Sequence, residues 1–424
     1  MKIERHKAYK DSEIEHLGEV PKHWRTQRIK DLSVLQSGNN ITSEQIEAEG
    51  KYPVYGGNGL RGYFSKYTNN GSYILIGRQG ALCGNINHAF GRFWATEHAI
   101  VVYLKHSICM KWYGEMLRTM NLNQYSVSAA QPGLSVDRIK RLLLPVPPLP
   151  EQKSIAHYLD TKTAQIDRKI DLLTQKATLY SNLKQSLINE TVTRGLDKTV
   201  PMKDSGIEWL GKVPERWKVR HFKQFSTMKG RIGWQGLKHA EFIDEGPFLI
   251  TGMNFKGGKI NWDEVYHITD ERYEQAPEIQ LKENDILMTK DGTIGKLLYV
   301  DNIPSPHKAS LNSHLLVFRP IRRSFHPKYL YYQLDSSAFQ DYVEIAKAGT
   351  TFFGISQAAV GRYIAVIPPL TEQEAIADYL DTKTAQIDQI IQTINTQIGK
   401  LKELRKTLIN DVVTGKIKVV ENEY

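Results

Sequence analysis

Several segments of the sequence have residue types and spacings similar to those of known catalytic or ligand sites. Residues 57–62 read GNGLRG, the glycine spacing that cradles a dinucleotide when a strand precedes it and a helix follows. The turn-rich sequence YFSKYTNNG follows instead, so we predict no dinucleotide site. Lys212 and Lys296 each follow a glycine, but neither precedes the Ser or Thr that binds magnesium in a phosphate-binding loop. These patterns predict no nucleotide-driven motor in this chain.

Two further patterns also fail on their context. The Pro-Pro pairs at 147–148 and 368–369 lack the preceding Asp or Asn and the following aromatic residue of an amino-methyltransferase site. Residues 151–153 read EQK, an ExK spacing found in nucleases, but a second copy of this segment reads EQE at 372–374. The second copy has Glu374 where the first has Lys153, so it lacks the lysine that such a metal site would need. We therefore interpret these residues as the start of a helix. We therefore predict a non-enzymatic chain with no catalytic residue.

Composition narrows the class of partner. Cys83 and Cys109 form no CxxC or Cys/His ligand spacing, so we expect no metal site, no disulfide framework and a reducing compartment. The N-terminus lacks the apolar core of a signal peptide, and no run approaches the roughly 20 apolar residues of a membrane span. A cytoplasmic location without membrane contact is expected. The 56 Lys and Arg against 46 Asp and Glu give a net charge of +10, which favours a polyanionic partner.

The strongest signal is internal duplication. At 424 residues the chain is too long for one ordinary core. EQKSIAHYLDTKTAQID at 151–167 recurs as EQEAIADYLDTKTAQID at 372–388, with fourteen of seventeen positions identical and an offset of 221. KDSEIEHLGEVPKHW at 10–24 recurs as KDSGIEWLGKVPERW at 203–217, with an offset of 193. Because the offsets of 221 and 193 differ by 28, the stretch between the two motifs is 28 residues longer in the second copy.

The closing motif of each copy leads into a predicted long amphipathic helix. No Pro or Gly interrupts residues 151–194, which predicts a helix of about 40 residues. Its narrow apolar stripe has three-four spacing, which is typical of a helix that pairs with another helix. The stripe residues of the two copies are Ile166, Ile170, Leu173, Ala177, Tyr180 and Leu187, and Ile387, Ile391, Ile394, Ile398, Leu401 and Leu408. Because the stripes match, we expect the two helices of one chain to pair in antiparallel orientation; a homodimeric coiled coil is the alternative.

The segments between the motifs indicate two mixed, mainly β domains. Short apolar runs such as 73–76 and 99–104, or 286–288 and 314–318, alternate with glycine-rich turns. The two copies correspond loosely: ILIGRQG at 74–80 matches ILMTKDG at 286–292, and Gly133-Leu134-Ser135 matches Gly354-Ile355-Ser356. The predicted fold class is therefore α+β, with two pseudo-symmetric domains joined by two long antiparallel coiled-coil helices.

The two motifs together resemble a known family. A segment similar to IEWLGxVPxxW that opens each domain, and a PPLxEQxxIAxYLDxxTxxID segment that closes it, resemble the specificity subunit of type I restriction-modification systems. His16 stands where the second copy has Trp209, a minor departure. The resemblance covers essentially the whole chain. It implies four segments: target recognition domain 1 (1–147), the central repeated region with the first long helix (148–198), target recognition domain 2 (199–368) and the distal repeated region with the second long helix (369–424).

The resemblance also implies a function. Each target recognition domain would recognise one half of a bipartite sequence in double-stranded DNA. The helices would set the spacer and dock two methyltransferase (modification) subunits, and restriction (motor-nuclease) subunits would join for cleavage. Adenine methylation and restriction would then belong to partners, so S-adenosylmethionine, ATP and Mg are expected on partner subunits and no cofactor in this chain. The alternative is a non-DNA interaction scaffold, with two β-rich binding domains on a coiled-coil spacer.

Polar residues in the glycine-rich loops are the predicted DNA contacts. Arg, Lys, Asn and Gln recognise base edges, whereas Lys, Arg, Ser and Thr bind phosphates. The same residue types are also ordinary on solvated loops. The DNA-binding residues predicted on this basis are Asn58, Arg61, Arg78, Gln79 and Gln131 in the first domain, and Lys229, Arg231, Lys256, Lys290, Thr293, Thr350 and Thr351 in the second.

Overall fold

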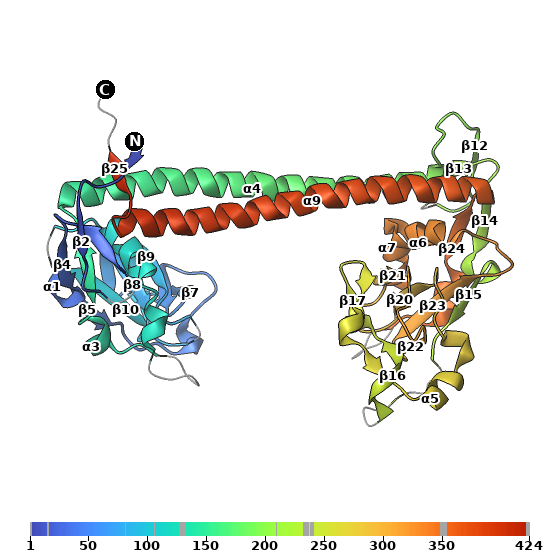
Figure 1. The fold of residues 1–424 in the computed structure, drawn as a ribbon, viewed down its shortest axis with the longest axis horizontal. Helices are drawn as coiled ribbons and strands as arrows, with labels where there is room; N and C mark the ends of the chain where they lie inside the picture. Colours follow the sequence, from blue (N-terminus) through green and yellow to red (C-terminus); the bar gives the residue numbers. More distant parts are fainter. Residues whose placement is uncertain are drawn as a thin grey trace. The chain divides into compact units, whose positions relative to one another are not determined.

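A computed structural model describes residues 2–14, 17–80, 82–105, 107–126, 133–208, 210–231, 237, 241–347 and 354–420. Contacts divide the chain into two units: the first comprises residues 1–174 with 395–424, and the second comprises residues 175–394. Each unit contains a β-rich domain and parts of two long helices (Figure 1). No described helix is long and apolar enough to cross a membrane.

The first unit is built on a six-stranded sheet with the order β5-β10-β8-β9-β6-β7. Neighbouring strands are antiparallel except β6 and β9, which are parallel. Successive side chains of a strand point to opposite faces, so Ile74 and Ile76 enter the main core while Leu75 enters a smaller cluster on the other face. The strands are β5 (Ser33–Ser37), β6 (Tyr52–Gly56), β7 (Gly59–Phe64), β8 (Asn69–Gly77), β9 (Ile86–Ala95) and β10 (Ala99–Leu104).

Helix α2 (Met110–Thr119) packs against β8 and β9 and buries Trp112 and Tyr113 completely. The strands outside the large sheet form three antiparallel pairs, β1·β25, β2·β3 and β4·β11. The remaining elements of this unit are β1 (Lys2–Glu4), β2 (Tyr9–Asp11), β3 (Glu19–Pro21), β4 (Arg25–Arg28), α1 (Ile29–Leu32), η1 (Ser43–Gln45), η2 (Leu122–Tyr125), α3 (Val136–Ile139), β11 (Leu143–Val146) and β25 (Lys418–Val420).

The second unit repeats the central part of this sheet. Its four-stranded antiparallel sheet has the order β15-β23-β20-β21, which matches β5-β10-β8-β9 strand for strand. The burial pattern is repeated as well, because Ile286 and Met288 enter one core cluster and Leu287 enters another. The strands are β15 (Ser226–Lys229), β20 (Ile286–Thr289), β21 (Leu297–Tyr299) and β23 (Leu315–Pro320). The predicted duplication and the α+β class are confirmed.

The two units differ mainly in the insert before the central strand. Only the stretch 38–68 separates β5 from β8, whereas the longer stretch 230–285 separates β15 from β20. The longer insert supplies β16 and β19, which form a separate three-stranded sheet of order β19-β16-β22. Its elements are β16 (Ile243–Ile250), η6 (Gly252–Asn254), β17 (Phe255–Lys256), β18 (Lys259–Ile260), η7 (Trp262–Glu264), β19 (Tyr266–His267), α5 (Asp270–Glu274) and η8 (Pro277–Ile279). Most of the additional length predicted for the second copy therefore lies in this insert.

The other elements of the second unit repeat those of the first. The pair β12·β13 matches β2·β3, and β14·β24 matches β4·β11. Helix α6 occupies the place of α2, and its Tyr329 is completely buried like Trp112. The elements are β12 (Met202–Asp204), β13 (Lys212–Pro214), β14 (Lys218–His221), η3 (Phe222–Gln224), β22 (Ala309–Leu311), α6 (Pro327–Asp335), α7 (Ser337–Ala346), α8 (Gln357–Arg362) and β24 (Ile364–Ile367).

The two long helices are α4 (Leu149–Arg194) and α9 (Leu370–Val413). They are 46 and 44 residues long, somewhat longer than predicted. Within each unit their segments run side by side in opposite directions (Figure 1). The residues of the predicted stripe are buried or half-buried in both helices. The ion pair Asp167–Arg405 joins the helices in the first unit, and Lys184–Asp388 joins them in the second.

A repeated joint fixes each domain to the helices. Trp24 is 1% exposed, and its Nε1 donates a hydrogen bond of 3.2 Å to Glu151 Oε2 in the first turn of α4. Trp217 does the same with Glu372 of α9 at 3.0 Å. Gln152, next to Glu151, donates to the Pro147 carbonyl and accepts from the backbone N–H of Cys109, the N-cap of α2. These contacts explain why Glu-Gln and the opening Trp recur together.

Candidate nucleic-acid interface

The most closely matched loops of the two units follow their central strands. We call residues 78–80, directly after β8, and residues 290–292, directly after β20, the tip loops. In the first unit the backbone N–H of Arg78 donates to the His98 carbonyl at 2.8 Å, and the N–H of Leu134 donates to the Arg78 carbonyl at 2.8 Å. A bridge between Gln79 and Gly133 continues this contact.

The second tip loop has the same backbone bonds. The N–H of Lys290 donates to the His314 carbonyl at 2.9 Å, and the N–H of Ile355 donates to the Lys290 carbonyl at 2.8 Å. A bridge joins Asp291 to Gly354. The sequence match between 74–80 and 286–292, and that between Gly133 and Gly354, is thus confirmed at the level of single hydrogen bonds. The side chains at equivalent positions differ, with Arg-Gln in one loop and Lys-Asp in the other.

The hairpin turn between β6 and β7 lies beside the first tip loop. A Cβ atom added to Gly57 would come within 2.8 Å of the Gln79 carbonyl oxygen, so the two backbones are in close contact. Asn58, next to Gly57, is exposed and accepts a hydrogen bond of 2.9 Å from Asn85 Nδ2. Gln79 and Arg61 are exposed, and Arg78 is half-buried. The structure therefore brings Asn58 and Gln79 together on neighbouring loops.

The candidates of the second unit are more dispersed. Lys229 is exposed at the end of β15, and Lys256 is exposed on β17. Lys256 forms an ion pair with Glu264, so its charge is partly neutralised. Lys290 is half-buried in the tip loop, and Thr293 is exposed just after it. The structure brings Lys290 and Thr293 together.

A cavity of about 610 Å³ adjoins the second tip loop. Its wall contains polar groups that donate and accept hydrogen bonds, beside apolar and aromatic side chains. The lining residues are Leu237, Phe242, Leu249, Thr251, Gly252, Met253, Tyr266, Thr289, Asp291, Gly292, Thr293, Lys296, Asn312, Ser313 and His314.

Arg231 differs from the prediction in its exposure. It is only 3% exposed, and its guanidinium donates from Nε to the Leu311 carbonyl at 2.9 Å and from Nη2 to Ser310 Oγ at 3.1 Å. These bonds fix the segment after β15 to strand β22. Arg231 in this position contributes to the fold and offers no surface to a groove of DNA, so we correct its predicted role. Gln131, Thr350 and Thr351 lie outside the described residues.

Sequence reasoning missed two histidines and an aspartate at the tip loops. His98 precedes β10 and pairs through Nε2 with Glu97 at 3.1 Å. His314 precedes β23 and pairs through Nδ1 with Asp291 at 2.6 Å. The carbonyls of both histidines accept the tip-loop hydrogen bond. The position of each histidine just before the equivalent strand was the signal available in the sequence.

The rejected catalytic patterns have structural roles in the fold. Residues 57–62 form the turn and the start of the second strand of a β-hairpin, and no helix follows them. Glu151 lies in the first turn of α4, as predicted for a helix-start residue. Both cysteines are free.

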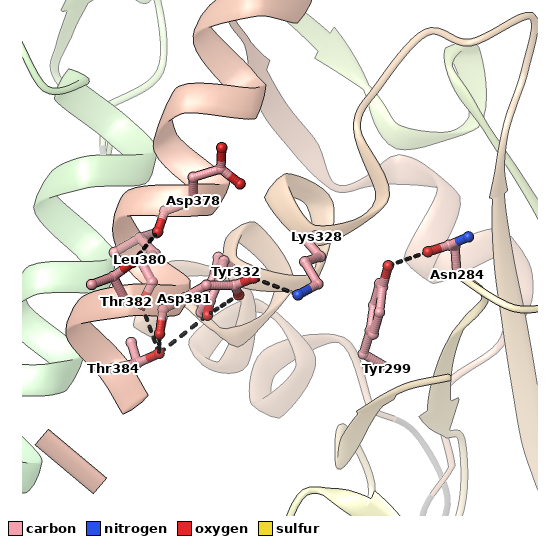
Figure 2. Close-up of polar contacts among 9 residues, drawn as sticks. All are labelled: Asn284, Tyr299, Lys328, Tyr332, Asp378, Leu380, Asp381, Thr382 and Thr384. Carbon is pink, nitrogen blue, oxygen red and sulfur yellow. Dashed lines mark hydrogen bonds and ion pairs between the residues drawn. The ribbon is translucent and has the colours of Figure 1, made fainter. Parts of the chain in front are cut away.

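A polar cluster holds α6 against α9 in the second unit (Figure 2). Tyr332 Oη donates to Asp381 Oδ1 at 2.7 Å and lies 3.1 Å from Thr384 Oγ1. Lys328 pairs with the same aspartate, and its Nζ lies 5.5 Å from the centre of the Tyr299 ring. Burial raises the pKa of Tyr299 to about 12. The first unit keeps the ion pair as Lys111–Asp160.

Comparisons with known proteins agree with this duplicated architecture. The family model described as type I restriction modification DNA specificity domain matches residues 21–177 and again 214–400. The starts of the two matches, at 21 and 214, reproduce the offset of the opening motif. This chain belongs to the type I restriction-modification DNA specificity family. The specificity assignment suggested by the repeated motifs is thereby confirmed.

Individual relatives of this specificity chain carry matching names. The EcoprrI specificity subunit of Escherichia coli is 42% identical over 183 residues, which cover 42% of this chain and 42% of the relative. The MjaVIII specificity subunit of Methanocaldococcus jannaschii is 24% identical over 418 residues, or 94% of each chain. A solved chain from a study of complex assembly and conformational transition of the type I R-M system shares the fold, with a TM-score of 0.71, 16% identity and coverage of 93% and 99%.

Proposed function

We propose that this chain is the DNA-reading subunit of a type I restriction-modification complex, in which each unit recognises one half of a bipartite sequence. The observation that carries the proposal is the pair of tip loops. They have the same backbone hydrogen bonds but different side chains. One scaffold that holds different polar residues at one place is what two unlike half-sites require.

The side chains of the tip loops suggest different base preferences. Arg and Lys donate to guanine and Gln pairs with adenine in the major groove, whereas Asp accepts from the amino group of cytosine. Arg78 and Gln79 would therefore prefer other bases than Lys290 and Asp291. The His314–Asp291 pair would orient the carboxylate in the second loop.

We propose that the catalytic work belongs to partner subunits. Two methyltransferase subunits would dock on the helices, and restriction subunits would join for cleavage in the cytoplasm. S-adenosylmethionine, ATP and Mg would be bound by those partners. Support for equivalent docking sites comes from Leu183 of α4 and Leu404 of α9, which are related by the offset of the closing motif and are 52% and 54% exposed. Exposed leucines at equivalent positions are suited to the same partner surface twice.

The test is reconstitution of this chain with the methyltransferase subunits of its own restriction-modification system. Wild-type complex should methylate adenines only in DNA that carries one split sequence, which methylation sequencing of random DNA identifies. Replacement of residues 25–147 by the same stretch of a relative should change one half-site and leave the other intact. Change of both half-sites, or methylation without sequence preference, would contradict the two-reader proposal and favour an interaction scaffold.

Single substitutions sharpen the same assay. Gln79→Ala should relax the preference in one half-site, with a loss of about 1–3 kcal/mol for the preferred base. Asp291→Ala should do the same in the other half-site. Lys229→Ala serves as a control for phosphate contact, because it should weaken binding to all sequences and reduce the salt dependence.

A further inference from the structure

Three potential metal ligands meet in the first unit, outside the tip loops. His6 lies between β1 and β2, His23 directly precedes the joint tryptophan Trp24, and Glu151 lies in the first turn of α4. One ligand atom of each residue lies within 4.8 Å of the others. The three residues come from segments that are far apart in the sequence, since His23 and Glu151 are separated by 128 residues.

The distances suit a tetrahedral cation. His23 Nε2 lies 2.9 Å from Glu151 Oε2, and His6 Nε2 lies 3.7 Å from Glu151 Oε1. Zinc bonds to nitrogen and oxygen of about 2.0–2.2 Å place neighbouring ligands about 3.4 Å apart in a tetrahedron. Because one ligand atom of each residue lies within 4.8 Å of the other two, small changes of the side-chain torsions would bring all three within bonding distance of one cation.

His6 supplies an independent indication of a ligand. Its side chain is 3% exposed, and its Nε2 atom has no hydrogen-bond partner among the described residues. Buried polar atoms nearly always have a partner, so an unpaired one needs an explanation. The Glu151 carboxylate lies 3.7 Å from this atom, so Nε2 faces the place where a cation would lie.

The carboxylate is already oriented for this role. Trp24 Nε1 and His23 Nε2 both lie within hydrogen-bond distance of Glu151 Oε2, at 3.2 Å and 2.9 Å, whereas Oε1 faces His6 Nε2 at 3.7 Å. Such outer hydrogen bonds are typical of metal sites, because they fix the ligand and raise its affinity. A cavity of about 620 Å³ gives access from solvent, and its lining includes His6, His23 and Glu151 together with Lys7, Lys22 and Lys418.

We propose that His6, His23 and Glu151 form a Zn²⁺ site, with water as the fourth ligand. Two imidazoles and one carboxylate are a ligand set that zinc takes in proteins. The bound ion ties the N-terminal segment to the start of α4. Lys7, Lys22 and Lys418 along the cavity reduce the affinity, since their charges repel a cation. The site is independent of DNA reading by the tip loops.

The second unit shows that the joint itself does not need these histidines. At the offset of the opening motif, Thr199 and Arg216 stand where the first unit has His6 and His23. The Trp217–Glu372 hydrogen bond forms without them. The histidines are thus an addition to the first joint. The sequence predicted no metal site because these ligands are far apart along the chain, whereas a recognisable metal motif has ligands at short spacing.

The test is titration of metal-free full-length protein with Zn²⁺. Calorimetry measures the stoichiometry and affinity, and competition with a coloured chelator checks the affinity. One equivalent should bind to wild-type protein, and His23→Asn should weaken that binding about 100-fold or more, because it removes a ligand. Co²⁺ in the same site should give the visible absorption of a tetrahedral ion, and this absorption should vanish in His23→Asn. The His23 side chain is 51% exposed, so the fold should persist.

Matched variants in the two units distinguish loss of a zinc ligand from loss of the hydrogen bond between tryptophan and glutamate at the joint. Glu151→Gln and Glu372→Gln each remove one carboxylate that accepts from a buried tryptophan, but only Glu151→Gln should abolish zinc binding. Arg216→Asn, the counterpart of His23→Asn, should leave zinc affinity unchanged. Equal zinc affinity of wild-type protein and His23→Asn, or an octahedral cobalt spectrum, would overturn the site. Both outcomes leave DNA methylation specificity, and with it the proposed function, unaffected.

Discussion

The two units share the same sheet order and the same joint to the long helices, but they differ in the side chains of their tip loops and in the insert before the central strand. In both, a central strand with three consecutive apolar residues, which enter core clusters on its two faces, lies in a sheet of the same order and ends in a loop held by the same backbone hydrogen bonds. In both, a buried tryptophan bonds to the first turn of a long helix. The inserts before the central strand differ, because one forms a hairpin on the sheet edge and the other a separate three-stranded sheet.

This difference shows which parts of the fold can change in sequence without loss of the shared structure. The hydrogen bonds within the sheet and at the tip loops join backbone groups, which do not depend on the side chain, so side chains at the tips can change without loss of these bonds. The insert also changes the packing next to the central strand. Gly77 of β8 lies directly against the hairpin, and a Cβ at this position would come within 2.1 Å of the Gly57 carbonyl oxygen. The equivalent position in β20 is Thr289, which carries a side chain without conflict.

The largest predicted effect follows from this contrast. Gly77→Ala should destabilise the first unit by about 3 kcal/mol or more, because backbone must move to admit the methyl group. Thr289→Ala should cost only about 1–2 kcal/mol, since it removes the hydroxyl that accepts from the Lys296 N–H. Hydrogen exchange of amides in β8 and β20 measures the two effects separately. Similar losses in both units would break the proposed difference in packing.

The joint should instead respond alike in both units. Trp24→Phe and Trp217→Phe each delete a buried N–H that bonds to a glutamate, together with part of a core side chain. We expect about 2 kcal/mol of destabilisation in either case. Thermal unfolding of the single and double variants, followed by circular dichroism, checks this. A loss confined to one unit would show that the two joints are not equivalent.

The sequence predicted the helices and sheets well but predicted the roles of individual loop residues poorly. The repeated motifs, the three-four spacing and the short apolar runs between glycine-rich turns are local signals, so the helices, the duplicated sheets and the match at Gly133 and Gly354 were accessible. Arg231 was predicted to contact DNA because it lies in a glycine-rich segment. Its partners Leu311 and Ser310 lie far along the chain, and no short pattern encodes such a contact. The ligand group around Glu151 was missed for the same reason.

The stability of the two units should also depend differently on pH. Burial raises the pKa of Asp335, at the end of α6, to about 6, with Lys184 opposing the shift and Asp388 adding to it. The folded state therefore favours the protonated acid, and the second unit should lose stability as the pH rises from about 4 to 6. Asp335→Asn should remove this loss. We expect a gain of about 1 kcal/mol at pH 7, reduced for partial exposure, and none at pH 4.

Urea unfolding of the second unit at both pH values measures this change. The first unit has Arg118 at the corresponding place of α2, so it lacks this carboxyl and should not show the same loss of stability between pH 4 and 6. An equal gain at pH 4 and pH 7 would mean that Asn stabilises the site through packing rather than through the charge.

The smallest effect concerns the ion pairs between the helices. Asp167 pairs with Arg405 at 2.9 Å and Lys184 with Asp388 at 2.7 Å, and the offset of the closing motif relates each residue of one pair to its counterpart in the other. Because all four side chains are partly exposed, double-mutant cycles with alanine should give coupling of about 0.2–1 kcal/mol in each unit. High salt should weaken both values alike. A strong coupling in one pair only would show that the equivalence of the two pairs in sequence does not extend to their energetics.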